Sequence, residues 1–377
     1  MQQIRVIYII NDSGWSGSTI ALKNLLECIP KAEVLPLIVC NHDGPFCNWL
    51  SNNNIQYTIF SYPWNYRPRT QTLRDKVAYY WRIYKFYKAE KRATKYLESL
   101  CQTFKPDIIH SNNGIISFGY KVAKKLKIKH VWHIREYQTK DFGMIPIPSM
   151  RDFKRKAQDE YTICITKDIQ KYFELDNNKS IVIYDGVFHQ NTYRYSASKE
   201  NYFLFVGRIE QSKGIDILID TFQKYCSLNN GNTATLKIAG KGTPQYEEYI
   251  KQKVLQYGIE TNVQFLGFRN DCFDLMYNAK ATIVPSRCEG FGFITVEAIN
   301  NGCMVIGNNN AGTAEIASQC NKMVLLYNNE KQLLDLMSNV SPNHSIIKDE
   351  QKLANNLFSC EISAKQVVEF YRFILKQ

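Results

Sequence analysis

Two acidic side chains flank a glycine-containing loop in the second half of the chain. The stretch reads Val284-Pro285-Ser286-Arg287-Cys288-Glu289-Gly290-Phe291-Gly292-Phe293-Ile294-Thr295-Val296-Glu297-Ala298. An apolar run before the loop predicts a strand and the run after it a helix, so main-chain N–H groups near Phe291 to Phe293 are expected at a helix N-terminus, where anions and hydroxyls bind. The carboxylates of Glu289 and Glu297 accept hydrogen bonds from sugar hydroxyls. This spacing suits a ligand with a phosphate between two polyols, and an ordinary helix start with acidic neighbours is the alternative.

Two cations lie on another loop of the same half, in Phe205-Val206-Gly207-Arg208-Ile209-Glu210-Gln211-Ser212-Lys213-Gly214. Arg208 and Lys213 stand five positions apart across an expected strand-to-helix turn. They can converge on one phosphate pair, the Arg as a planar fork and the Lys as a point charge. Because this loop and the acidic loop both follow strands, we expect them at the same edge of one sheet, which disfavours two unrelated surface cations.

Short β-branched runs alternate with longer amphipathic segments, which predicts strand-helix-strand units and mostly parallel sheets. Expected strands are 4–10, 34–40, 55–60, 107–110, 129–134, 161–165 and 180–184, then 202–206, 234–239, 263–266, 281–284, 303–307 and 322–325. Expected helices are 19–28, 70–103, 115–126, 214–225, 245–257, 293–300 and 361–376. Two doubly wound α/β halves leave a cleft facing the C-terminal ends of both sheets, where such folds bind ligands.

Length and composition agree with this organisation. A chain of 377 residues points to two domains of roughly 180 residues each, and the polar stretch 188–201 is the expected boundary. A hydrophobic content of 45% and a charged content of 22% are typical of a folded soluble protein. No apolar run approaches the roughly 18 residues needed to cross a bilayer. Disorder, fibre and integral membrane protein are therefore excluded.

The compartment is predicted from the N-terminus and the cysteines. The first residues lead directly into the apolar run Val6–Ile10, which is too short for a signal-peptide core. Eleven cysteines occur with no Cys-x-x-Cys pair, which suits free thiols better than a disulfide framework or a zinc site. We therefore expect a cytoplasmic protein.

Taken together, several motifs resemble the retaining nucleotide-sugar glycosyltransferases of family 4. In the second half they are Gly207-Arg208 with Lys213-Gly214, Ile238-Ala239-Gly240-Lys241-Gly242, Phe265-Leu266-Gly267, and Pro285-Ser286 with Glu289-Gly290-Phe291-Gly292 and Glu297-Ala298. In the first half they are Asp107-Ile108-Ile109-His110, Trp132-His133-Ile134-Arg135-Glu136, Ile163-Cys164-Ile165-Thr166 and Val182-Ile183-Tyr184-Asp185-Gly186-Val187. The resemblance covers most of the chain and is weakest over 60–105 and 137–160.

The resemblance implies the GT-B fold, in which two Rossmann-like doubly wound domains face a central cleft. It implies an N-terminal acceptor-binding domain over 1–190 and a C-terminal nucleotide-sugar-binding domain over 191–360. The last segment, 361–377, is expected to form a helix that packs back toward the N-terminal domain.

The resemblance also implies roles for residues of the second half. Arg208 and Lys213 would hold the donor diphosphate and stabilise charge on the departing nucleotide. Glu289 would contact the hydroxyls of the donor sugar, and Glu297 would hold the ribose. The other donor-binding residues expected in this half are Gly207, Gly240, Phe291, Gly292 and Phe293.

In the first half, the resemblance implies that Gly14 and Gly17 let the backbone approach the donor phosphates and the acceptor closely. His133, at the end of an expected strand, would line the reaction centre; without the resemblance, a lone histidine there is more often structural. Three positions depart from the family pattern: Met304 stands where Pro is frequent, Asp185 where Asn is frequent, and Ser16-Gly17 where two glycines are common.

The expected function is that of a retaining, hexosyltransferase-type enzyme acting in surface polysaccharide biosynthesis. It would move a sugar from a UDP- or GDP-sugar to a saccharide or lipid-linked saccharide. The resemblance implies no metal and no cofactor beyond the donor, and a leaving phosphate that itself deprotonates the acceptor, so no general base is nominated. Residues outside the motifs determine the donor sugar, the base and the acceptor.

Other functions remain as alternatives. A nucleotide-sugar epimerase or a sugar phosphorylase would keep the fold and change the reaction. A non-catalytic sugar-binding pseudoenzyme is disfavoured because Arg208, Lys213, Glu289 and Glu297 are all present. A nicotinamide dehydrogenase is disfavoured because Gly14-x-x-Gly17 with Asp43 does not complete Gly-x-Gly-x-x-Gly. Gly240-Lys241-Gly242-Thr243 likewise lacks the full phosphate-binding P-loop pattern.

The net charge of +12 is concentrated in one segment. Residues 64–97 hold ten cations against Asp75 and Glu90, and also hold nine aromatic residues. The cations are Arg67, Arg69, Arg74, Lys76, Arg82, Lys85, Lys88, Lys91, Arg92 and Lys95. This mixture favours peripheral contact with an anionic membrane, at the inner face of the plasma membrane, with a solvated helix face as the alternative. No nucleic-acid-binding module accompanies it, so nucleic acid is not an expected partner.

Overall fold

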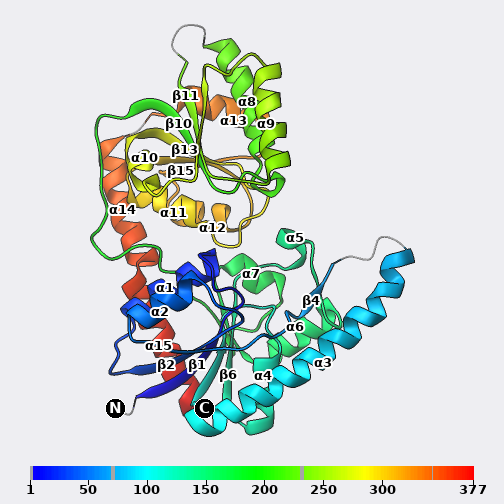
Figure 1. The fold of residues 1–377 in the computed structure, drawn as a ribbon. Coiled ribbons are helices and arrows are strands. Elements are labelled where there is room, and N and C mark those ends of the chain that lie inside the picture. Colours follow the sequence, from blue (N-terminus) through cyan, green and yellow to red (C-terminus); the bar gives the residue numbers. More distant parts are fainter. Residues whose placement is uncertain (1–2, 69–72, 230–232, 342) are drawn as a thin grey trace. The chain divides into compact units, whose positions relative to one another are not determined.

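The computed structural model describes residues 3–68, 73–229, 233–341 and 343–377, with the side chains of 73–77 left out. Two compact units make up the chain (Figure 1). Unit 1 comprises Met1–Gly186 and Cys360–Gln377, and unit 2 comprises Val187–Ser359. Of the cations predicted to form the basic segment, Arg69 and the side chains of Arg74 and Lys76 lie outside the described residues.

Unit 1 is built on a parallel sheet of seven strands in the order β3-β2-β1-β5-β6-β8-β9. They are β1 (Ile4–Ile9), β2 (Val34–Cys40), β3 (Gln56–Ile59), β5 (Ile108–Ser111), β6 (Lys129–Ile134), β8 (Tyr161–Cys164) and β9 (Ser180–Val182). The helices are α1 (Gly17–Cys28), α2 (Pro45–Asn52), α3 (Leu73–Phe104), α4 (Phe118–Leu126), α5 (Thr139–Phe142), α6 (Met150–Asp159), α7 (Lys167–Tyr172) and α15 (Cys360–Lys376). A two-stranded antiparallel ribbon joins β4 (Tyr66–Arg67) to β7 (Ile145–Pro146).

Both faces of this sheet are covered, as continuous apolar strands require. Alternate residues of β1 enter two different cores: Val6 and Tyr8 pack with α1 and α15, whereas Ile7 packs with α3 and α4. The C-terminal helix α15 buries Val367 and Tyr371 in the first of these cores. The prediction that the last helix packs back onto the N-terminal domain is therefore confirmed (Figure 1).

Unit 2 contains a parallel sheet of six strands in the order β12-β11-β10-β13-β14-β15. They are β10 (Glu200–Val206), β11 (Thr235–Ala239), β12 (Val263–Gly267), β13 (Ala279–Val284), β14 (Met304–Asn308) and β15 (Val324–Tyr327). The helices are the 3₁₀ turn η1 (Gln211–Lys213), α8 (Ile215–Leu228), α9 (Pro244–Gln256), α10 (Cys272–Asn278), α11 (Phe293–Asn300), α12 (Ala311–Gln319), α13 (Glu330–Asn339) and α14 (His344–Phe358).

Each sheet has one place where the strand order reverses direction. In unit 1 this switch point lies between β1 and β5, and in unit 2 between β10 and β13. The two doubly wound parallel sheets that the sequence predicts are thus confirmed. In such sheets the crevice for ligands opens beyond the C-terminal ends of the strands at the switch point. The loops after these four strands are therefore the places to look for chemistry.

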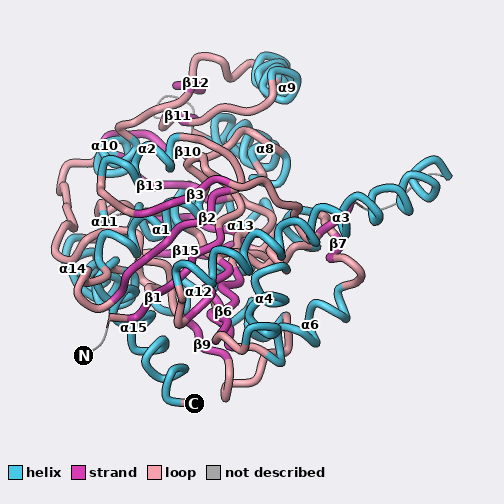
Figure 2. Tube along the Cα trace, turned by 60° about the horizontal axis from the view of Figure 1, so that its bottom comes forward, coloured by secondary structure: helices cyan, strands magenta, loops and turns pink. Residues whose placement is uncertain are grey.

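The long helix α3 has two parts with different surroundings. Its C-terminal part packs into the unit through Ala93, Leu97 and Cys101, whereas its N-terminal end extends away from the body of unit 1 in both views (Figures 1 and 2). Within the residues that the structure describes, each helix is too short or too polar to cross a bilayer.

Candidate functional site

The switch point of unit 2 brings two of the predicted site residues into direct contact. Lys213 ends the 3₁₀ turn after β10, and Glu289 lies on the loop between β13 and α11. The Nζ of Lys213 is 2.6 Å from Oε1 of Glu289, and the two side chains are 24% and 17% exposed. Ser286 donates a hydrogen bond of 2.6 Å to the same oxygen. A half-buried ion pair thus sits where the strand order reverses, open to exchange partners with a ligand.

The two loops are joined through their main chains. The N–H of Arg287 donates to the carbonyl of Ser212 at 2.9 Å, and the Arg287 guanidinium pairs with Asp216 at 2.7 Å. Gly214 has φ +68°, and a Cβ placed on it would lie 2.0 Å from the carbonyl oxygen of Pro285. Only glycine fits this position, because it tolerates both the positive φ and the close approach.

The helix predicted over 293–300 is observed as α11, which begins directly after Gly292. The loop before it is held in place by residues at the end of β14 and directly after it. Asn308 and Asn310 each donate a side-chain hydrogen bond to the Ser286 carbonyl, at 3.2 and 3.1 Å, and the N–H of Gly312 donates to the Glu289 carbonyl at 2.9 Å. The first turn of α11 therefore lies beside Glu289, the arrangement in which main-chain N–H groups bind anions.

Glu297 lies in the body of α11 and is partly buried. Burial raises the pKa of its carboxyl group to about 7. In the ligand-free protein this group therefore takes up and releases a proton near neutral pH, unlike an ordinary surface glutamate.

Arg208 lies apart from the Lys213–Glu289 pair, and Gly207 and Gly240 have a structural role in the loops after β10 and β11. The Arg208 side chain is 65% exposed and pairs with Glu210 at 3.1 Å, so the structure does not join it to Lys213. The expected convergence of both cations on one phosphate stays a prediction. Gly207 donates its N–H to Ala239 at 3.0 Å, and a Cβ on Gly240 would meet the Gly207 carbonyl oxygen at 1.8 Å. The glycines thus hold the loops after β10 and β11 together.

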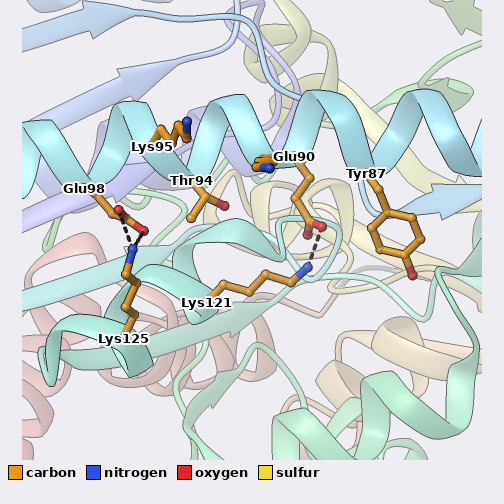
Figure 3. A pocket seen from close by; sticks show the side chains of 8 residues that line it. Tyr87, Glu90, Thr94, Lys95, Glu98, Lys121 and Lys125 are labelled. Carbon is orange, nitrogen blue, oxygen red and sulfur yellow. Dashed lines mark hydrogen bonds and ion pairs between the residues drawn. The ribbon is translucent and has the colours of Figure 1, made fainter.

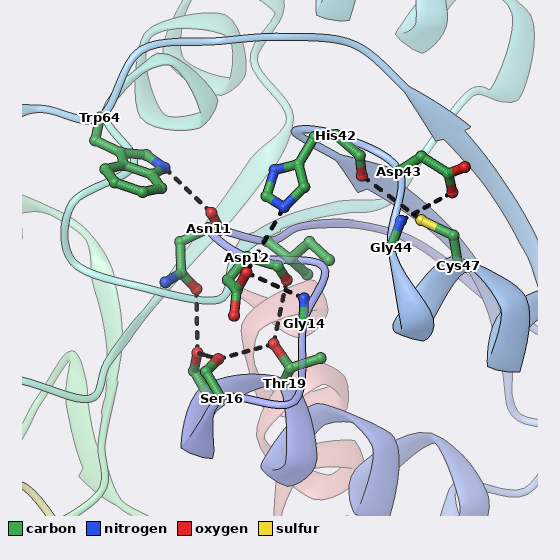
Figure 4. Close-up of polar contacts among 12 residues, drawn as sticks. Asn11, Asp12, Gly14, Ser16, Thr19, His42, Asp43, Gly44, Cys47 and Trp64 are labelled. Carbon is green, nitrogen blue, oxygen red and sulfur yellow. Dashed lines mark hydrogen bonds and ion pairs between the residues drawn. The ribbon is translucent and has the colours of Figure 1, made fainter. Parts of the chain in front are cut away.

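In unit 1, the loop after β1 is closed by its own polar groups (Figure 4). Asp12 accepts the N–H of Gly14 at 3.0 Å, and Thr19 donates to the Asp12 carbonyl at 3.1 Å. Trp64 donates to the carbonyl of Asn11 at 3.2 Å. Gly17 is the first residue of α1 and faces open space, so no neighbouring atom of the protein requires a glycine there. Its expected role in close approach to a ligand stays a prediction.

His133 lies in β6 within a buried polar cluster. Its Nδ1 is 3.2 Å from Nη2 of Arg135 and 3.2 Å from Nε2 of His110. Nη1 of Arg135 pairs with Asp185, and its Nη2 donates to Asn112 at 3.2 Å. Burial, and then the Arg135 charge, lower the pKa of both histidines well below the ordinary value, so both are neutral at pH 7.

One further side chain, which no sequence motif indicated, connects this polar cluster to the start of α1, beside the loop that holds Gly14 and Gly17. Asn112, directly after β5, donates to the Ser18 carbonyl at 3.3 Å. Asn112 and Tyr371 were missed among the site residues, since an isolated Asn or Tyr carries no spacing signal. Ser286, His110 and Arg135 stand in motifs that carry the family resemblance, and this could have indicated them.

A pocket of about 370 Å³ lies between α3 and α4 (Figure 3). Two ion pairs join the helices along it: Lys121 with Glu90 at 2.5 Å and Lys125 with Glu98 at 2.8 Å. The residues that line it are Tyr87, Glu90, Lys91, Thr94, Lys95, Glu98, Lys121 and Lys125. These pairs fasten the middle of α3 to the unit, while the other lysines keep this face basic.

Solved structures share this architecture over nearly the whole chain. HepE of Anabaena, solved in complex with UDP, matches with a TM-score of 0.77 and 19% identity, covering 97% of this chain and 99% of that one. The same protein in complex with UDP-glucose matches with a TM-score of 0.74. Two Rossmann-like sheets with these neighbours define the GT-B fold, and the prediction of this fold is confirmed.

The family is indicated by the sequence of unit 2. Residues 194–356 match the family model described as "Glycosyl transferases group 1". An uncharacterized glycosyltransferase of Methanocaldococcus jannaschii is 28% identical over 184 residues, 47% of this chain and 46% of that protein. The capsular polysaccharide biosynthesis glycosyltransferase CapH of Staphylococcus aureus is 25% identical over 138 residues, 37% of this chain and 39% of that protein.

Residues 194–356 therefore belong to the group 1 glycosyltransferases, in agreement with the resemblance of the motifs to family 4. The match to the first curated relatives spans about half of their length.

Proposed function

We propose that the protein is a retaining glycosyltransferase that moves a sugar from a nucleotide-sugar donor to a saccharide or a lipid-linked saccharide in surface polysaccharide biosynthesis. The observation that carries the proposal is the Lys213–Glu289 pair beside the start of α11, at the switch point of unit 2. The UDP and UDP-glucose complexes of HepE support a nucleotide-sugar donor, and the similarity to CapH supports a role in polysaccharide synthesis.

The Lys213–Glu289 pair is suited to bind both the phosphate and the sugar of such a donor. An ammonium group has three N–H donors, and Glu289 uses only one of them. Lys213 can therefore bind a phosphate oxygen while Glu289 accepts hydrogen bonds from sugar hydroxyls. As the bond between sugar and phosphate breaks, negative charge grows on the nucleotide. Lys213, the first turn of α11 and an inward-turning Arg208 would stabilise that charge, which is the main electrostatic task of the reaction.

The remaining predicted residues receive roles in the same proposal. Glu297 would accept hydrogen bonds from the ribose, and His133 would contact the transferred sugar. Because positive side chains and the helix start supply the charge stabilisation, no metal is assigned to the reaction. The acceptor proton would pass to the leaving phosphate oxygen on the same face of the sugar, which retains the anomeric configuration.

The direct test is turnover with a panel of donors. Purified protein would be incubated with UDP- and GDP-sugars together with free and lipid-linked oligosaccharides. We expect mass spectrometry to detect an acceptor heavier by one hexose, and NMR to show the anomeric configuration of the donor retained. Binding of donor without turnover across the panel would contradict the proposal, as would an epimerised nucleotide sugar or an inverted product.

We also infer that α3 brings the protein to an anionic membrane surface. Tyr80, Trp81 and Tyr84 are 76%, 58% and 56% exposed near the projecting end of the helix. Lys85 lies over the Trp81 ring at 5.0 Å, and Lys88 is exposed on the same helix. Exposed aromatic rings among lysines are typical of surfaces that insert rings at the lipid headgroups and attract anionic lipid.

Vesicle co-sedimentation tests this inference. We expect the protein to pellet with phosphatidylglycerol-containing vesicles at low salt and to be released at high salt, because exposed charges are screened. Replacing Lys85 and Lys88 with glutamate should abolish pelleting. A matched control replaces Lys348 and Lys352, two exposed lysines of α14, and should pellet normally. If both variants pellet equally, or if the unchanged protein does not pellet, the inference is wrong and α3 presents a solvated helix face.

A further inference from the structure

A chain of hydrogen bonds connects the C-terminal helix to His133. The hydroxyl of Tyr371 in α15 is 2.6 Å from Nδ1 of His110 in β5. Nε2 of His110 is 3.2 Å from Nδ1 of His133 in β6. All three side chains are at most 2% exposed. Water therefore does not compete for these groups, and each contact constrains where the neighbouring protons are.

Arg135 decides where the proton on His133 is. A guanidinium group has only N–H donors and no acceptor, and its Nη2 lies 3.2 Å from Nδ1 of His133. Nδ1 must therefore present its lone pair. Since the ring is neutral, its proton is on Nε2, which has no hydrogen-bond partner among the described residues although it is buried.

The same reasoning places the protons on His110 and on the hydroxyl of Tyr371. Because Nδ1 of His133 is an acceptor, Nε2 of His110 must carry a proton and donate it, sharing that lone pair with Arg135. Nδ1 of His110 is then an acceptor, and the hydroxyl of Tyr371 donates to it. The hydroxyl of Tyr371 also lies 3.0 Å from that of Tyr8, in a geometry that favours Tyr371 as the donor. Because a hydroxyl has one proton, Tyr371 can donate either to His110 or to Tyr8, and the bare Nδ1 of His110 selects the first. One assignment of protons thus satisfies the contacts from α15 to His133.

We propose that Arg135 fixes His133 as the tautomer with its proton on Nε2, and that Tyr371 and His110 are positioning residues that hold this ring in place, ready to donate a hydrogen bond to the transferred sugar. This inference rests on the proposed function for the role of His133. No proton moves along the chain. The hydrogen bonds determine which ring nitrogen of His133 is the donor. The Arg135–Asp185 pair holds in place the guanidinium that excludes the other tautomer.

The tautomers are measurable without any substrate. In the protein with ¹⁵N-labelled histidine, long-range ¹H–¹⁵N spectra distinguish protonated from bare ring nitrogens, and single substitutions assign the six histidines. We expect His110 and His133 both to have the proton on Nε2 and a bare Nδ1. A proton on Nδ1 of His133, or on both of its nitrogens, would overturn the proposal.

Tyr371→Phe removes only the terminal hydroxyl and keeps the buried ring. We expect signals of the second tautomer at His110, a shifted Nε2–H signal of His133, a roughly 10-fold fall in kcat, and a nucleotide Kd within about two-fold of the unchanged protein. Tyr8→Phe is the matched variant, because it removes the hydroxyl on the far side of Tyr371 and should keep both tautomers. A fall in kcat with unaltered tautomers in Tyr371→Phe would sink the positioning role.

The experiment separates this inference from the proposed function. If no donor is turned over while the spectra show the expected tautomers and the second tautomer of His110 in Tyr371→Phe, the transferase proposal fails and the hydrogen-bond chain stands. If turnover is normal in Tyr371→Phe, the transferase proposal stands and the positioning role fails.

Discussion

The two units use the polar groups that follow their strands in opposite ways. In unit 2, Lys213 and Glu289 form an ion pair that remains partly in contact with solvent. In unit 1, the Arg135–Asp185 pair is almost completely buried and stands beside neutral histidines. A charge near water can exchange its partner for a ligand at little cost, whereas a buried one cannot. In the proposed reaction, unit 2 would supply charge and unit 1 would supply fixed geometry.

The largest expected difference is in stability. Arg135→Met leaves Asp185 buried without its partner and should lower the free energy of unfolding by about 3–5 kcal/mol. Lys213→Met breaks a half-exposed pair and should cost about 1 kcal/mol or less. Urea unfolding of both variants measures this, and the double replacement Arg135→Met with Asp185→Leu should recover part of the loss. Equal destabilisation by the two single variants would remove the contrast between the two ion pairs.

For turnover we expect the opposite ranking, with the larger effect at the Lys213–Glu289 pair. Lys213→Ala or Glu289→Ala is expected to lower turnover at least roughly 100-fold, about 2.7 kcal/mol in the barrier, because each removes a group that binds the reacting donor. Unfolding curves should remain close to those of the unchanged protein. Lys224→Ala is the control, since it breaks a lysine pair with Glu330 on the surface of the same unit. Near-normal turnover in the Lys213 or Glu289 variant would reject the site assignment.

A change of pH should have a smaller effect, which is on the affinity of unit 2 for the nucleotide. The pKa of Glu297 is raised to about 7 by burial, so the ligand-free carboxyl is mostly protonated at pH 6 and mostly ionised at pH 8. If the ionised form accepts the ribose hydroxyls, nucleotide affinity should rise by up to about tenfold between these values.

Calorimetric titration with UDP at pH 6, 7 and 8 measures this change. Glu297→Gln cannot ionise at this position, so it should retain only the pH dependence that comes from the phosphates of the ligand. The same dependence in both proteins would show that Glu297 does not face the nucleotide.

Most of the fold could be predicted from the sequence, because parallel strands buried on both faces leave continuous apolar runs. The helices missing from the prediction include α12, α13 and α14. In α14, Glu350, Gln351 and Asn355 are buried, which removes the apolar period that indicates a helix. Gln351 donates to the carbonyls of Arg194, Ile299 and Asn300. The partners that make burial of this side chain favourable are far away in the chain and could not be read from its neighbours.

The sequence by itself determined which loops are candidates for the site. Glycines, cations and acids that directly follow apolar strands must lie at the C-terminal edge of a sheet, and this follows from local patterns alone. Only the tertiary structure decided the partners of the buried groups: that Lys213 meets Glu289, and that Tyr371 meets His110 across 261 positions of the chain. The physical reason is that a buried polar group must find its hydrogen bond among whatever elements pack around it, and that packing is a property of the whole fold.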